Sequence, residues 1–207
     1  DCPQRDERMG WTGDAQIYVR AATFNADIAA FYTKWLRDLN DDQWDYGAYP
    51  AYAPRPLARP NEHHAAGWMD AGVICPWTIW QVYGDKRVIT EHWRKMQDFM
   101  LWRKLRDPEL KGATDDCAFG DWLSLGDVKT PIPFIDLAYH AYDAKLMAEM
   151  ADAIGHKQQA AAYREQADKA AEAFRKLYLK PDGSLAIHNQ SAYAMALFFG
   201  LIPEAQH

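Results

Sequence analysis

Helical periodicity is the feature that most limits how this chain can fold. Seven segments place apolar side chains at every third or fourth residue, the spacing of helices with one buried face. Glycine or proline ends several of these patterns, as at Gly84, Pro108 and Gly155. The predicted helices begin near Asp14, which we expect to cap the first one, and then cover 27–39, 68–83, 88–105, 134–154, 157–179 and 191–201. No segment shows a convincing strand pattern, so the sequence predicts an all-α fold.

The connections between these segments alternate between short turns and long loops. Residues 41–66 carry four prolines, which hold the backbone extended, and three tyrosines, which favour a packed and functional loop. Residues 111–133 are rich in glycine, aspartate and proline and contain Phe119-Gly-Asp-Trp122, which is typical of a site loop. A simple helical bundle does not need loops of this length. The alternation favours helical hairpins arranged in a ring, with short turns on one rim and functional loops on the other.

Charge and hydropathy exclude two classes of partner. The chain has 23 Lys and Arg against 29 Asp and Glu, and its basic residues are scattered singly, unlike those of a nucleic-acid-binding face. The longest apolar runs, such as 195–202, are far shorter than the roughly 18 residues that a membrane span requires. We therefore expect no nucleic-acid partner and no membrane span.

Metal and cofactor sites are also not predicted. The three cysteines, Cys2, Cys75 and Cys117, lack the spacing of a zinc site or a disulfide framework. His63 and His64 have no third ligand at metal spacing, which favours a surface pair. The sequence contains no phosphate-binding glycine loop and no serine-nucleophile motif. We therefore expect no metal and no cofactor.

Aromatic residues are unusually frequent, with nine tryptophans, eleven tyrosines and eight phenylalanines. A core can be built from leucine, isoleucine and valine, so this many flat rings indicates that some have another purpose. A sugar ring stacks its apolar C–H face on an aromatic plane, while its hydroxyl groups need polar neighbours. The alternative is that most of these rings are buried in the core. A small carbohydrate or oligosaccharide is therefore the leading candidate substrate.

The first fourteen residues combine four carboxylates and two arginines with Trp11 between Gly10 and Gly13. The glycines allow the backbone to come close to a ligand. An inverting glycosidase needs one carboxylic acid to protonate the departing oxygen and a second carboxylate to activate water. Further carboxylates and arginines bind sugar hydroxyl groups through charge-assisted hydrogen bonds. A salt-bridged surface turn has the same composition, so both interpretations stay open on these features alone.

The order of these residues is a more specific signal. The segment Asp1-Cys-Pro-Gln-Arg-Asp-Glu-Arg-Met-Gly-Trp-Thr-Gly-Asp14 resembles the signature of the bacterial α-L-rhamnosidases of glycoside hydrolase family 78 at nearly all of its positions. Two further segments agree in order: Gly67-Trp-Met-Asp-Ala-Gly-Val-Ile-Cys-Pro-Trp77 with Tyr83-Gly-Asp85, and Phe119-Gly-Asp-Trp-Leu123 followed by Thr130-Pro131. The similarity continues through 139–150 and 189–197 and thus covers the whole chain.

This resemblance implies an (α/α)6 six-hairpin barrel, of which residues 1–207 form an incomplete N-terminal portion of the catalytic domain, with no second domain. It also implies an inverting hydrolase that releases terminal α-linked L-rhamnose from rhamnosides or rhamnose-containing polysaccharides. Glu7 corresponds to the general acid of the family. The positions that correspond to residues around the sugar are Asp1, Arg5, Trp11, Asp14, Trp68, Asp70 and Trp122. Asp70 stands at a predicted helix start, where a carboxylate is commonly a cap.

The general base of the family, a glutamate, lies downstream of Leu201, and its motif is absent from the last residues here. Glu204 follows Pro203 in a different context and does not match it. We therefore expect the rest of a larger multidomain chain to supply the base. Two alternatives remain: another (α/α)6 glycosidase, such as a glucosidase or an uronyl hydrolase, and a non-catalytic carbohydrate-binding fragment.

Overall fold

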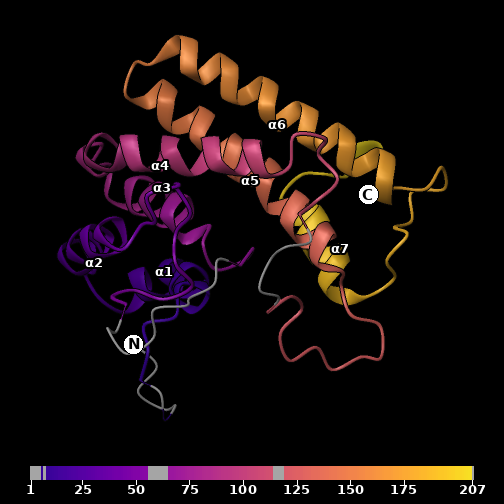
Figure 1. Cartoon of the computed structure of the whole chain (residues 1–207), viewed down its shortest axis with the longest axis horizontal. Coiled ribbons are helices and arrows are strands. Elements are labelled where there is room, and N and C mark those ends of the chain that lie inside the picture. The colour runs from indigo at the N-terminus through magenta and orange to yellow at the C-terminus, as the bar shows by residue number, and fades with distance from the viewer. Residues whose placement is uncertain (1–5, 7, 56–64, 114–118, 207) are drawn as a thin grey trace.

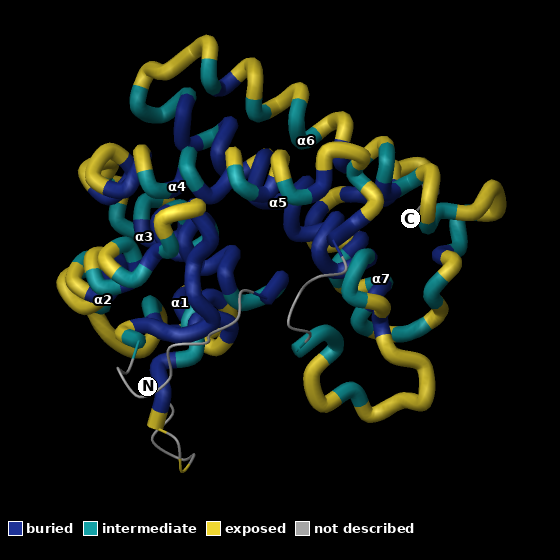
Figure 2. The backbone as a smooth tube through the Cα atoms, in the orientation of Figure 1, coloured by how far each residue is buried: buried dark blue, intermediate teal, exposed yellow. Residues whose placement is uncertain are grey.

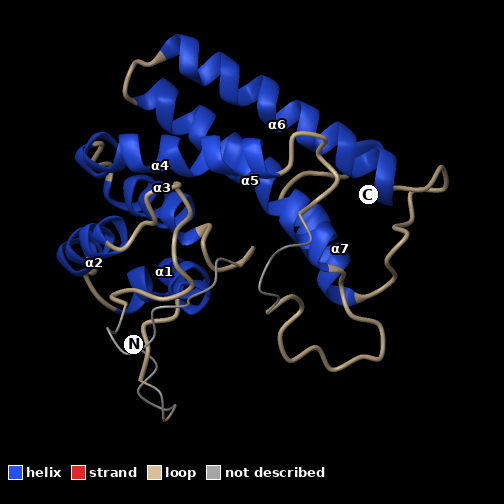
Figure 3. Ribbon diagram, in the orientation of Figure 1, coloured by secondary structure: helices blue, strands red, loops and turns tan. Residues whose placement is uncertain are grey.

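The computed structural model describes residues 6, 8–55, 65–113 and 119–206, and its regular elements in these ranges are helices (Figure 3). They are α1 (Thr12–Asn25), α2 (Ala29–Asp41), α3 (Ala71–Tyr83), α4 (Arg87–Arg106), α5 (Ile132–Ala153), α6 (Lys157–Tyr178), α7 (Gln190–Phe198) and a short 3-10 turn at Glu204–Gln206. Extended pairing in the described ranges is limited to two isolated bridges, Trp11 with Tyr52 and Leu179 with Leu185. The prediction of an all-α fold is confirmed.

All seven predicted helices are present, but some of their ends differ from the prediction. α1 begins at Thr12, so Asp14 lies in its first turn rather than at its cap, where a carboxylate still favours the helix N-terminus. α3 begins at Ala71 rather than at Trp68 because the preceding residues form turns. α7 ends at Phe198 because Gly200 takes a φ of +73°, and the Leu201 N–H donates back to the Ala196 carbonyl.

The helices follow one another in pairs (Figure 1). Within each pair, a turn of only three residues separates the two helices; these turns are 26–28, 84–86 and 154–156. The long connections 42–70 and 107–131 run between pairs. Gly84 and Gly155 take positive φ angles of 71° and 82° in two of the short turns. This arrangement confirms the predicted alternation of short turns and long loops.

The helices form an inner row and an outer layer. α1 packs on α3, α3 on α5 and α5 on α7, whereas α2 and α4 pack against α3 and α6 packs along α5. α5 is buried along almost its whole length, but α6 buries only one stripe, at Ala160, Ala170 and Phe174 (Figure 2). Among the helices described, none is both long and apolar enough to cross a membrane.

The buried residues form two apolar clusters of different size. The larger one runs through all seven helices and includes Leu36, Phe99 and Phe134. The smaller one joins Met9, Ala51 and Tyr52, with three further aromatic rings packed against it. The smaller cluster brings the N-terminal motif onto the proline-rich connection and leads to the cavity described next.

Candidate active site

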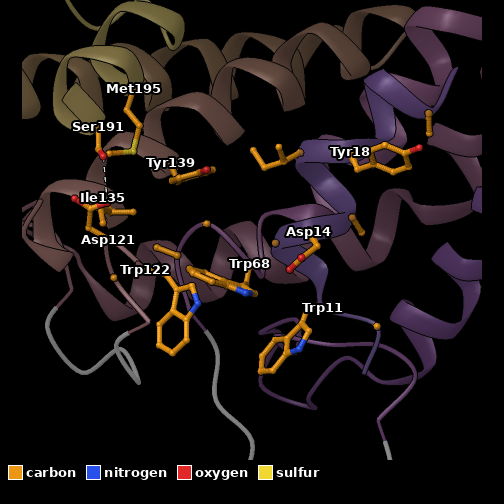
Figure 4. A pocket seen from close by; sticks show the side chains of 18 of the residues that line it. Trp11, Asp14, Tyr18, Trp68, Asp121, Trp122, Ile135, Tyr139, Ser191 and Met195 are labelled. Carbon is orange, nitrogen blue, oxygen red and sulfur yellow. Dashed lines mark hydrogen bonds between the residues drawn. The ribbon is translucent and has the colours of Figure 1, made fainter. Parts of the chain in front are cut away.

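A cavity of about 1180 Å³ lies between α1, α2, α5, α7 and the long connections (Figure 4). Aromatic rings, two carboxylates and apolar side chains line it together; those used below are Trp11, Asp14, Trp68, Asp121, Trp122, Ile135, Tyr139, Ser191 and Met195. The cavity therefore combines flat apolar surfaces with hydrogen-bonding groups. Four of the residues predicted for a sugar site, from three separate segments, are brought together here.

Trp11 is held by pairing between the motif and the proline-rich connection. The Thr12 N–H donates to the Ala51 carbonyl over 2.9 Å, and the Ala53 N–H donates to the Gly10 carbonyl over 3.0 Å. The Trp11 ring meets the ring of Tyr52 edge to face, with 5.2 Å between centroids. The buried, paired backbone at 51–53 agrees with the prediction that this connection is a packed loop.

Asp14 is exposed in the first turn of α1 and lines the cavity. In Figure 4 its carboxylate points toward the part of the cavity where the rings of Trp11 and Trp68 lie. The position combines an acceptor for hydroxyl groups with two adjacent apolar planes, which is the combination that a sugar ring needs.

Trp68 lies in the turn before α3, and its ring packs on the backbone of α1. A methyl group added to Gly13 would lie 2.9 Å from the Cδ1 and Nε1 atoms of Trp68, far inside normal contact distance. The sequence predicts that the glycines of the motif let the backbone approach a ligand. At Gly13, however, the space is filled by the Trp68 ring, because this glycine permits α1 and the indole to touch.

Trp122 lies on the long connection before α5 and is 61% exposed. The neighbouring Asp121 carboxylate accepts hydrogen bonds from the Thr130 N–H (3.0 Å), the Thr130 hydroxyl (2.9 Å) and the Ser191 hydroxyl (3.1 Å). Partial burial opposes ionisation of Asp121, but these hydrogen bonds outweigh it and lower the pKa of the carboxyl below its ordinary value. Asp121 thus ties the Trp122 segment to the first turn of α7.

Phe119 does not line the cavity itself, but it packs against three rings that do, and the sequence predicts no role for it. Its ring contacts those of Trp11, Trp68 and Trp122, at centroid distances of 5.4, 4.8 and 6.0 Å. Three tryptophans from different segments therefore share one phenylalanine. The one sequence feature that points to Phe119 is its position in the motif Phe119-Gly-Asp-Trp122.

The structure places Asp70 differently from its predicted position at the sugar. The side chain is fully buried, is not among the cavity lining, and forms an ion pair with Arg103 of α4. Arg103 also bonds Asp143 (3.1 Å) and Asp136 (3.2 Å), so three carboxylates surround one buried guanidinium. Asp70 is the residue before α3, yet its carboxylate does not cap that helix; it accepts a hydrogen bond from the Gly67 N–H. Burial and the neighbouring Asp70 raise the pKa of Asp143.

Several predicted residues lie outside the residues that the structure describes. They are Asp1, Arg5 and Glu7 of the motif, together with the His63–His64 pair. In the described ranges, no group of three or more His, Cys, Asp or Glu side chains is arranged to hold a metal ion.

The inner helices contribute lining residues to which the sequence assigned no role in the site. Ile135 and Tyr139 come from α5, and Ser191 and Met195 come from α7. Burial raises the pKa of the Tyr139 hydroxyl above its ordinary value, so this group stays protonated at neutral pH. Hydrophobic periodicity predicts that these helix faces are buried, but it does not separate a packed face from one that faces a cavity.

The helices follow one another in pairs, and the cavity lies at one end of the inner helices. This arrangement is that of a class of helical-hairpin domains whose site is lined by aromatic rings and carboxylates. Within that class, the chain belongs to the family of bacterial α-L-rhamnosidase six-hairpin glycosidase domains, whose model matches residues 1–207. The described helices form part of that six-hairpin barrel, as the sequence predicted.

Three comparisons show how close the similarity is. The α-L-rhamnosidase of Streptomyces avermitilis is 37% identical over 205 residues, which are 99% of this chain and 19% of that protein. A crystal structure of the Streptomyces avermitilis enzyme complexed with L-rhamnose matches with a TM-score of 0.89 and 36% identity, over 98% of this chain and 19% of that one. The α-L-rhamnosidase structure from Dictyoglumus thermophilum matches with a TM-score of 0.89 and 31% identity, over 99% of this chain and 23% of that one. The chain thus spans about a fifth of the length of these relatives.

Proposed function

We propose that the protein carrying this chain is a glycoside hydrolase that releases terminal α-linked L-rhamnose from rhamnosides or rhamnose-containing polysaccharides. One observation carries the proposal: Trp11, Asp14, Trp68 and Trp122, from three separate segments, line one cavity. Membership of the α-L-rhamnosidase domain family and the relatives of that name support it.

The chemistry of the cavity suits this sugar. L-Rhamnose carries a methyl group in place of one hydroxymethyl group, so it presents more apolar surface to aromatic rings than an ordinary hexose does. Trp11, Trp68 and Trp122 supply such rings, and Asp14 supplies an acceptor for hydroxyl groups. Asp1 and Arg5 are proposed as further sugar-binding residues on the basis of their motif positions.

Glu7 is the proposed general acid, which protonates the glycosidic oxygen as the bond to the anomeric carbon breaks. Inversion needs a second carboxylate about 6.5–9.5 Å away to activate water. We expect this general base in the part of the relatives' length that the chain does not span. Residues 1–207 would then be the N-terminal portion of a catalytic domain within a multidomain protein.

The test compares Glu7→Gln with wild type in the full-length protein. A general acid contributes about 10²- to 10⁴-fold to the rate, so we expect a loss of this size on an alkyl rhamnoside. A nitrophenyl leaving group needs little protonation, and the loss should be much smaller with nitrophenyl α-L-rhamnoside. Glu172→Gln, on the exposed face of α6, is the matched control and should retain wild-type rates with both substrates.

Two outcomes would overturn the assignment. One is wild-type turnover of the alkyl rhamnoside by Glu7→Gln, and the other is an equal loss with both leaving groups. Two further measurements address substrate and stereochemistry. A panel of aryl glycosides should show release from the α-L-rhamnoside and not from glucosides, and NMR of the first product should show the β-anomer of L-rhamnose. Initial release of the α-anomer would exclude inversion.

A further inference from the structure

Gln16 is a buried polar residue on α1, two positions after Asp14, and is only 4% exposed. Its Nε2 atom donates to the Gly67 carbonyl over 2.5 Å and to the Tyr139 hydroxyl over 3.4 Å. Gly67 immediately precedes Trp68 in the chain. The Gln16 side chain therefore links α1 to the backbone that carries Trp68, although the two are separated by 51 residues.

Both the N–H and the carbonyl of Gly67 form hydrogen bonds with buried side chains. Its N–H donates to Asp70 over 2.6 Å, and Asp70 is in turn fixed by the buried Arg103. Its φ of +87° favours glycine, since other residues rarely adopt that conformation. Without the hydrogen bond from Gln16, the Gly67 carbonyl would lose the partner that connects it to α1.

The ring of Trp68 meets the same helix one turn earlier. Gly13 is so close to the indole that a side-chain methyl there would lie 2.9 Å from two of its ring atoms. Gly13 and Gln16 therefore fix two different parts of the Trp68 segment against α1. Both contacts hold the Trp68 segment against the helix that carries Asp14.

We propose that Gln16 is a positioning residue, which holds Trp68 in place as a wall of the sugar pocket through its hydrogen bond to Gly67. The inference rests on the proposed function. The Oε1 atom of Gln16 is buried and has no hydrogen-bond partner among the described residues. A buried amide oxygen without a hydrogen-bond partner lowers the stability of the folded state. A gain in stability therefore does not explain Gln16 at this position, and a role in placing Gly67 does.

The experiment compares Gln16→Met with Gln43→Met in the full-length protein. Gln43 is a matched control, because it is also buried and its Nε2 donates to two carbonyls, of Gly47 and Lys95, each over 2.8 Å. It is not among the cavity lining. We expect Gln16→Met to raise KM for an aryl α-L-rhamnoside about tenfold with kcat within about threefold, because one hydrogen bond's net worth corresponds to such a factor. Gln43→Met should lower thermal stability and leave KM unchanged.

A double-mutant cycle shows whether Gln16 acts through Trp68. Trp68→Ala removes the ring, so adding Gln16→Met to it should raise KM by less than about twofold. If the two KM factors multiply instead, Gln16 does not act through Trp68 and the proposal is wrong. An unchanged KM in Gln16→Met, or an equal rise in Gln43→Met, would also overturn it.

Gly13→Ala is a second variant that keeps the test decisive if Gln16→Met does not fold. The added methyl group must displace the packed Trp68 ring, and this cost outweighs the higher helix propensity of alanine, so we expect lower thermal stability together with a raised KM. A purely structural role of the Gly13 contact would lower thermal stability and leave KM unchanged, as expected for Gln43→Met. An unchanged KM in this variant would contradict the importance of the Trp68 position.

Failure of the proposed function can be told apart from failure of this inference. If wild type releases no rhamnose, the proposed function fails, but the position of Trp68 is still measurable. The near-ultraviolet circular dichroism of wild type minus that of Trp68→Phe reports the fixed indole. This difference signal should largely disappear in the Gln16→Met background and persist in the Gln43→Met background. Its persistence in both would overturn the positioning role.

Discussion

Trp68 and Trp122 line the same cavity, but the protein holds them by different means. Trp68 packs on Gly13, and its backbone is tied to the buried residues Gln16 and Asp70. Trp122 is 61% exposed and stands on a connection that also exposes Leu123 and Leu125. One aromatic wall is therefore part of the folded core, and the other belongs to a surface segment.

The difference lies in what must break for each wall to move. Displacing the Trp68 segment means breaking contacts with α1 and with the buried ions around Arg103. Displacing the Trp122 segment means breaking a few hydrogen bonds near the surface, those of Asp121 to Thr130 and Ser191 and those of Asn189 to Val128 and Thr130. Local opening is cheapest where few buried contacts are lost. We therefore expect the Trp122 wall of the wild-type protein to open without unfolding, whereas the Trp68 wall stays in place as long as its contacts with α1 and Asp70 are intact.

The largest expected effect comes from Arg103→Met. Removing this guanidinium leaves Asp70, Asp136 and Asp143 buried without their main counter-charge. Breaking a buried ion pair by deleting one partner costs about 3–5 kcal/mol in the free energy of unfolding. In the full-length protein, thermal unfolding should show a lower melting temperature for the domain to which residues 1–207 belong.

Arg94→Met is the control on the same helix. Arg94 is exposed and pairs with Asp98 one turn away, so solvent already screens the interaction and little stability should be lost. Equal loss in the two variants would show that the Arg103 cluster does not stabilise the fold, and the contrast between the two walls would no longer hold.

Asp121→Ala should have an intermediate effect that falls on substrate binding. It leaves the N–H of the buried Thr130 without its acceptor, which costs about 1–3 kcal/mol locally, whereas the Thr130 hydroxyl can still donate to Asn189. If the closed segment is then populated about a tenth of the time, KM rises about tenfold. Trypsin should also cut faster after the exposed Lys129, which reports opening without any substrate.

Asp127→Ala tests whether this effect belongs to Asp121 rather than to any carboxylate of the segment. Asp127 is exposed on the same connection, and its replacement should change neither KM nor the rate of cleavage. Cleavage that stayed slow in Asp121→Ala would contradict the expectation that this carboxylate holds the Trp122 segment closed.

The contrast also shows which parts of the molecule the sequence could predict. Local periodicity predicts all seven helices, because burial of one face every three to four residues is encoded within each segment. The gathering of Trp11, Trp68 and Trp122 follows from the motif resemblance. The role of Asp70 could not be predicted, because its partner Arg103 lies 33 residues away and only folding brings the two together.

Gly13 and Phe119 illustrate the same limit within the motifs themselves. A glycine beside a tryptophan indicates a close approach, but not whether a ligand or a distant indole fills the space. Phe119 is visible in the sequence, yet its contacts with rings of three other positions depend on how two long connections meet. Residue type is local information, whereas these contacts are set by the tertiary fold.

The smallest expected effect is the pH dependence of the Asp121 contacts. Hydrogen bonds overcome the effect of burial and hold the pKa of Asp121 below its unfolded value, which is near 4. Its stabilising contribution is therefore complete above about pH 4 and is lost as the pH falls through the lower folded value. The melting temperatures of wild type and Asp121→Asn should differ at pH 6 and converge as the pH falls below about 4. The difference should be modest because Asp121 is partly exposed to solvent. A difference that stays constant over this range would mean that the Trp122 segment is not held by the ionised carboxylate.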